Sequence, residues 1–279
     1  MNASARYVVG VDGSAPSEAA LAWAVRNARR DGASLELVHV IDPEQGMMGL
    51  DLLDAAERAG ERILAEATQR IRMQHPELEV AAELLSGVPT WTLAAHARGD
   101  DTLVVGTGKT GYVSGRVLGS RSVQFALAAT GTVAVVPEGD PRFRDGVVAG
   151  VDRPETAASI GRRAALEAVD RGMRVTLVHA VPPEVLQSQR TNVESPLVLA
   201  SEAAREVEGM LEIRSRLSTR VPADALLDAS RGSALLVVGT GSVAETHSPL
   251  GTTLHAVLLN ANAPVLVVRP AGALAHSAG

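Results

Sequence analysis

The sequence contains the same pattern twice, and this internal repeat constrains the fold more than any other feature. YVVGVD at 7–12 returns as VVAGVD at 147–152, which is 140 positions later. TLVVGTG at 102–108 returns as LLVVGTG at 235–241, but only 133 positions later, so the second copy is seven residues shorter in between. The 279-residue chain is therefore predicted to be two duplicated domains. The expected domains are 1–137 and 145–279, with 138–144, which contains Pro141 and residues of both charges, as the linker.

Within each copy, short β-branched runs alternate with Ala-, Arg- and Glu-rich segments of helical spacing. This strict alternation predicts two tandem doubly wound, five-stranded parallel sheets of the Rossmann-like α/β class. Strands are expected at 7–11, 35–40, 79–84, 102–105 and 133–136, and again at 147–151, 175–179, 211–217, 235–238 and 265–268. First-copy helices are expected at 17–30, 53–73, 90–97 and 120–129. Because the last strands are edge strands in this topology, we expect the two copies to pack through them as an intramolecular pseudo-dimer.

The composition excludes several classes of function. A net charge of −6 disfavours a nucleic-acid partner and anionic membranes, and 2% aromatic residues disfavour an aromatic groove for bases or sugars. The absence of cysteine excludes disulfides, thiolate metal sites and cysteine nucleophiles. No apolar signal core stands at the start of the sequence, and no stretch approaches the roughly 20 apolar residues that span a bilayer. The expected location is the cytoplasm.

The first candidate site residues are Asp12 and Asp152, at the end of the opening strand of each copy. Ligands of open parallel sheets bind outside the carboxyl ends of the strands, so both aspartates are well placed for a ligand. An Asp or Ser before a helix also commonly caps that helix, and the sequence leaves this alternative open.

The second candidate is the loop 106–120, which holds five glycines among hydroxyl residues and leads into a helix. Such a loop lets backbone N–H groups approach an anion closely, and a polyphosphate fits this chemistry. A P-loop is excluded, because that motif needs a glycine where Leu103 stands inside a strand. Gly106, Gly108 and Gly111 form GxGxxG, but the helix starts only after Gly119, so a dinucleotide fold is a minor alternative.

The chain resembles the universal stress protein family over both copies. The resemblance rests on VVGVDGS at 8–14, LVHV at 37–40, SGVP at 86–89, VVG at 104–106 and GRVLGSRS at 115–122. It implies five-stranded parallel sheets with an ATP crevice between the first and fourth strands, in a family whose bacterial members often carry two such domains.

Carried over residue by residue, the resemblance places Asp12 near the ribose and the magnesium of Mg-ATP, and Val11 and Val40 beside the adenine. It places Val105 and Gly106 at the start of the loop. The predicted cofactor-binding residues of the first copy are Gly10, Val11, Asp12, Val40, Val105, Gly106, Lys109, Gly119, Ser120 and Ser122. Those of the second copy are Asp152, Ala180, Gly239, Gly251 and Thr252.

The sequence departs from the family pattern at two positions of this loop. Lys109 stands where the family has its second glycine, and the second copy has Ser242 there and one residue fewer before Gly251. A cradle of backbone N–H groups depends on the path of the chain, so we expect ATP in the first copy rather than the second.

The resulting prediction is an ATP-binding protein that regulates a stress response, not an enzyme of rapid turnover. Possible partners besides ATP are a second copy, in a homodimer, and unknown proteins. One alternative is an interaction module that no longer binds nucleotide, and another is a dinucleotide-dependent enzyme. His39 and His179 are expected to be packed, hydrogen-bonded residues, and Trp23 and Trp91 are expected to pack in the core.

Overall fold

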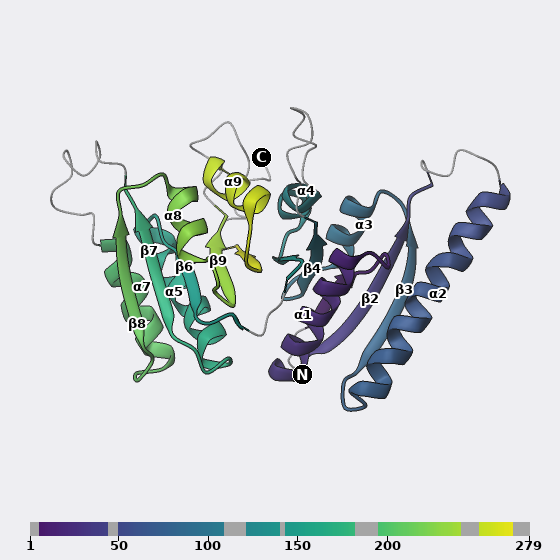
Figure 1. Ribbon diagram of the computed structural model, residues 1–279, viewed down its shortest axis with the longest axis horizontal. Coiled ribbons are helices and arrows are strands. Elements are labelled where there is room, and N and C mark those ends of the chain that lie inside the picture. The colour runs from purple at the N-terminus through teal and green to yellow at the C-terminus, as the bar shows by residue number, and fades with distance from the viewer. Residues whose placement is uncertain are drawn as a thin grey trace. The chain divides into compact units, whose positions relative to one another are not determined.

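The computed structural model describes residues 6–43, 50–108, 121–139, 143–181, 195–240 and 251–269. The chain divides into two compact units, Met1–Gly139 and Asp140–Gly279 (Figure 1). The extent of the linker stays a prediction, because residues 140–142 lie outside the described ranges. Among the described residues, every helix is too short or too polar to cross a membrane.

The first unit is a five-stranded parallel sheet, as the alternation of strands and helices predicts, and its strand order is β3-β2-β1-β4-β5. Its elements are β1 (Arg6–Gly10), α1 (Ala15–Asp31), β2 (Ser34–Ile41), α2 (Leu50–Gln74), β3 (Val80–Ser86), α3 (Pro89–His96), β4 (Thr102–Thr107), α4 (Arg121–Ala128) and β5 (Thr132–Pro137). The chain runs outward from β1 to β3 and then crosses to β4 on the other side of β1. The boundary between β1 and β4 is therefore the switch point of the sheet, where such folds bind ligands.

The second unit repeats this topology in the order β10-β9-β6-β7-β8. Its elements are β6 (Val147–Gly150), α5 (Pro154–Val169), β7 (Val175–Ala180), α7 (Ser195–Val207), β8 (Ile213–Ser218), α8 (Pro222–Ala229), β9 (Leu235–Gly239), α9 (Thr252–Asn260) and β10 (Val265–Val268). The strand β8 begins two residues later than the expected 211–217. The expectation that the two copies pack through their last strands stays a prediction.

The central strands of each sheet, β1 and β4 in the first unit and β6 and β9 in the second, are buried on both faces by aliphatic side chains and helices. Val8 and Val9 in β1 are fully buried, which explains the continuous apolar runs in the sequence. In both units, the first strand ends in a glycine, and a leucine of the third helix packs directly against it. A Cβ at Gly10 would lie 2.9 Å from Leu93, and a Cβ at Gly150 would lie 2.9 Å from Leu226.

The two units differ in how their first two helices pack. In the second unit, α5 and α7 approach backbone to backbone, because a Cβ on Gly161 would lie 2.2 Å from the carbonyl oxygen of Ala200. The first unit has Leu21 at the position of Gly161, and its helices α1 and α2 do not pack this closely. The first unit therefore keeps more space between these helices.

The expectation that both tryptophans pack in the core is confirmed for Trp23 and wrong for Trp91. Trp23 is 4% exposed and meets Tyr7 edge to face, whereas Trp91 is 64% exposed. The helix α3 buries Thr90, Leu93 and Ala94 at helical spacing, and Trp91 lies about 200° around the helix from Leu93. The short helix has one buried stripe, and Trp91 lies outside it.

Candidate functional site

A cavity of about 580 Å³ opens at the carboxyl ends of β1, β2 and β4 in the first unit. The residues that line it come from these strand ends and from α1, α2, α3 and α4. This volume lies in the range of small-molecule sites, and the location is the switch point of the sheet. Apolar side chains, among them Val40, Leu53 and Leu93, supply much of its wall.

The carboxylate of Asp12 is fixed at the mouth of this cavity by the turn that follows β1. The backbone N–H of Ser14 donates a 2.9 Å hydrogen bond to Asp12 Oδ1. Ser14, not Asp12, is the N-cap of α1, because its hydroxyl accepts from the N–H of Ser17. Ser14 therefore does the capping that the sequence also allowed for Asp12. The carboxylate of Asp12 is exposed and can meet other partners.

Partial burial raises the pKa of Asp12. Hydrogen bonds from Ser14 and Ser17, together with the nearby His39, lower this pKa by a larger amount. The net effect is a pKa below the ordinary value of an aspartate. Asp12 is thus a fixed negative charge at neutral pH, suited to accept hydrogen bonds from hydroxyl groups or to meet a cation.

The structure brings together six of the residues predicted for the first copy. The cavity-lining residues among them are Gly10, Val11, Asp12, Val40, Val105 and Gly106. Ser122 is buried, and its hydroxyl lies 3.3 Å from the hydroxyl of Thr107 at the end of β4. Lys109, Gly119 and Ser120 lie outside the described residues.

Gly106 has a structural reason for being glycine that does not depend on a ligand. A Cβ at Gly106 would lie 2.1 Å from the backbone oxygen of Pro16, so the end of β4 passes directly against the start of α1. Gly10 faces α3 on the other side of the sheet. These two glycines let helices from both faces approach the floor of the cavity.

Sequence reasoning missed three polar or aromatic side chains of the cavity. Arg121 lies in the first turn of α4, Asp42 follows β2, and Phe125 lies one turn after Arg121. The motif GRVLGSRS contains Arg121, and a cation at the start of a helix that follows a glycine-rich loop could have indicated a phosphate contact. Asp42 and Phe125 had no comparable signal in the sequence.

The histidine expectation is confirmed in both units. Nδ1 of His39 lies 2.7 Å from the carbonyl oxygen of Val11, and Nδ1 of His179 lies 2.7 Å from that of Val151. A carbonyl oxygen only accepts, so each ring carries its proton on Nδ1. The two histidines hold the end of the opening strand in place.

The second unit presents the corresponding positions with different chemistry. Asp152 has a 70% exposed side chain, and its Oδ2 lies 3.6 Å from Nε of Arg153. Pro154 replaces Ser14 and has no N–H to donate, and Ala157 replaces Ser17. The remaining predicted residues are placed as follows: Ala180 ends β7, Gly239 ends β9, Gly251 precedes α9 with a φ of +70°, and Thr252 begins α9.

These features define the class of protein: a tandem doubly wound α/β chain with a crevice at the switch point of its first sheet. The chain belongs to the universal stress protein family, whose model matches residues 5–137 and 144–269. A universal stress protein of Mycolicibacterium smegmatis is 28% identical over 283 residues, which cover 94% of this chain and 96% of that protein. One from Mycobacterium tuberculosis is 32% identical over 193 residues, covering 66% of this chain and 69% of that protein.

The fold is also that of a solved family member. The crystal structure of a universal stress protein from Archaeoglobus fulgidus matches with a TM-score of 0.72 and 16% sequence identity. The match covers 95% of this chain and 96% of that one.

Proposed function

We propose that the first unit binds ATP with magnesium and that the protein uses the bound nucleotide for regulation of stress response or growth rather than for rapid catalysis. The observation that carries this proposal is the cavity at the switch point, where the fixed carboxylate of Asp12 and the guanidinium of Arg121 occur together with apolar walls.

Each part of a nucleotide has a suitable partner among the lining residues. Asp12 is suited to the ribose hydroxyls, as acidic residues after a strand are in other doubly wound folds. Arg121 lies at the N-terminal end of α4, where the helix dipole adds to its positive charge, so it is suited to phosphate. Val40 and Leu53 offer apolar surface to the base.

One observation favours a second function, that of an interaction module independent of nucleotide. Trp91 is 64% exposed on α3, and Val88, just before the helix, is 46% exposed. Tryptophan is enriched at protein interfaces, so this part of the surface suits a protein partner.

A melting experiment separates these functions and the dinucleotide-dependent enzyme. Purified protein is freed of nucleotide, checked by mass spectrometry of the denatured sample, and melted with Mg-ATP, with NAD or with neither. At about one hundred times its dissociation constant, ATP should add roughly 2.7 kcal/mol and raise the melting temperature, whereas NAD should not. No shift with Mg-ATP would favour the interaction module, and a shift with NAD alone would favour the enzyme.

A further inference from the structure

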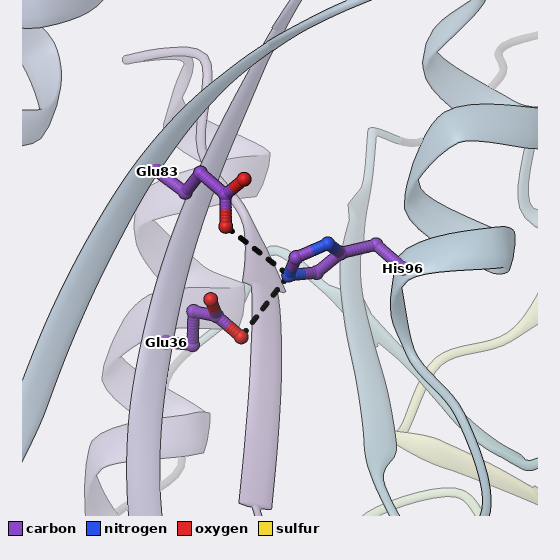
Figure 2. Close-up of side chains that lie close together, drawn as sticks. All are labelled: Glu36, Glu83 and His96. Carbon is purple, nitrogen blue, oxygen red and sulfur yellow. Dashed lines mark ion pairs between the residues drawn. The ribbon is translucent and has the colours of Figure 1, made fainter.

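A second group of polar side chains lies away from the cavity, on the face of the first sheet that α3 covers. Glu36 comes from β2, Glu83 from β3, and His96 from the last turn of α3. Figure 2 shows the two carboxylates and the imidazole of His96 pointing toward one another from these three elements. None of the three residues lines the cavity described above.

The distances within this group are close to those between the ligands of one metal ion. Nε2 of His96 lies 3.1 Å from Oε2 of Glu36 and 3.8 Å from Oε2 of Glu83, and the three ligand atoms all lie within 4.8 Å of one another. Ligand atoms around a tetrahedral Zn²⁺ are about 3.3 Å apart, given bonds of about 2.0–2.1 Å. The three side chains therefore need only small movements to share one ion.

The imidazole nitrogen indicates that a cation belongs at this point. Nε2 of His96 is buried and makes no hydrogen bond. A neutral imidazole would direct its lone pair at two carboxylates, which is electrostatically unfavourable. A proton on Nε2 would not satisfy the group, because Glu36 Oε2 at 3.1 Å is not aligned for a hydrogen bond and Glu83 Oε2 at 3.8 Å lies beyond hydrogen-bond distance. A metal ion would satisfy all three groups.

The charges around the group leave room for a divalent cation. Arg6 pairs with Glu36 and, through two hydrogen bonds, with Asp101. With Glu83, the neighbourhood holds three carboxylates against one guanidinium when His96 is neutral, so two negative charges are uncompensated. Glu36 is buried, which makes this excess charge costly without a further cation.

We propose that Glu36, Glu83 and His96 form a binding site for a divalent transition-metal ion of the Zn²⁺ type. An imidazole nitrogen favours Zn²⁺ over Mg²⁺ or Ca²⁺, which prefer oxygen ligands alone. Glu83 has a 48% exposed side chain, so an ion can enter from solvent and water can complete its coordination. The bound ion would tie the end of α3 to two strands, and it would therefore stabilise the first unit.

The test uses full-length protein without a histidine tag, treated with a chelator and kept free of nucleotide. Zn²⁺ binding is measured by competition with a chromophoric chelator, and Co²⁺ is used in place of Zn²⁺ for the visible absorption spectrum of its coordination. We expect one tight site per chain. His96→Gln and Glu83→Gln should each weaken Zn²⁺ binding at least about tenfold and change the Co²⁺ spectrum.

The matched control is His75→Gln, because His75 lies after α2 and, among the described residues, it approaches a carboxylate only at 4.0 Å, between its Nδ1 and Oε1 of Glu77. This variant should bind Zn²⁺ like the unchanged protein. Glu83 is exposed, so Glu83→Gln should keep the fold, and the melting curve of the metal-free variant verifies it. Absence of a tight site in the unchanged protein, or equal affinity in His96→Gln and the unchanged protein, would overturn the proposal. Because no nucleotide is present, this result is independent of ATP binding.

Discussion

The backbone N–H of Ser14 donates a 2.9 Å hydrogen bond to the carboxylate of Asp12, and this turn fixes the acid at the mouth of the cavity. The second unit cannot form the same turn, because Pro154 stands at the position of Ser14 and has no N–H. Asp152 is correspondingly left exposed beside Arg153. The two aspartates are equivalent in the repeat but not in their surroundings.

We therefore predict that Asp12→Asn and Asp152→Asn have different effects on ATP binding. Loss of a charged hydrogen-bond acceptor costs about 1.5–3 kcal/mol, so Asp12→Asn should weaken ATP binding at least about tenfold. Asp152→Asn should leave the affinity unchanged. Calorimetric titration of both variants is the measurement, and a larger loss from Asp152→Asn would show that the ligand binds in the second unit.

A second prediction concerns the role of Arg121 in phosphate binding. Arg121→Gln should weaken ATP binding about tenfold and leave adenosine binding unchanged, since adenosine carries no phosphate. The second copy has Thr253 at this position, which is another reason to expect a weaker site there. The control is Arg70→Gln, which removes an exposed arginine of α2 that pairs with Glu18. Equal losses of affinity for ATP and for adenosine would show that Arg121 does not contact the phosphates.

A third prediction compares Gly106, near the end of β4, with Gly108, which follows that strand. Gly106→Ala should lower the free energy of unfolding by about 1–3 kcal/mol, because its Cβ would collide with the backbone of Pro16. A Cβ at Gly108 would lie 3.6 Å from the Pro16 side chain, an ordinary contact, so Gly108→Ala should change stability by less than about 0.5 kcal/mol. Denaturant unfolding of the first unit measures both, and similar values would refute the close approach at Gly106.

A fourth prediction follows from the pKa of Asp101. Burial raises this pKa, but hydrogen bonds from Arg6 and from the backbone N–H of Arg98 outweigh it and hold the pKa below the ordinary value of about 3.9. A lowered pKa means that the ionised acid stabilises the fold above its unfolded pKa and that this stability disappears as the pH falls through the folded pKa. Asp101→Asn should lower the melting temperature of metal-free protein at pH 7 and have little effect below pH 3. An equal effect at both pH values would contradict this linkage.

The sequence predicted the topology well because the signals are local and occur twice. The alternation of apolar runs and helical segments located the strands that the structure describes in both units. The ends of the first and fourth strands indicated Asp12 and Gly106, and both residues line the cavity, while their role in binding stays a prediction. Trp91 was misplaced because one exposed residue in a short apolar helix has no periodic signal of its own. The contribution of Phe125 to the cavity depends on how α4 packs on the sheet, which the sequence pattern does not encode.

The sequence pattern also gave no indication of the group of Glu36, Glu83 and His96. These residues are far apart in the sequence, and none belongs to a recognisable ligand motif. They meet because β2 and β3 are parallel neighbours and α3 ends over them. Such a combination becomes visible only once the register of the strands is known.

The most direct test of the account is the number of ATP molecules that the nucleotide-free protein binds. Calorimetric titration with Mg-ATP should give one site per chain, because Asp12 with its serine turn and Arg121 occur only in the first copy. Asp12→Asn should remove most of the binding signal. Two equivalent sites per chain, or no binding at all by protein shown to be folded and free of nucleotide, would contradict the account.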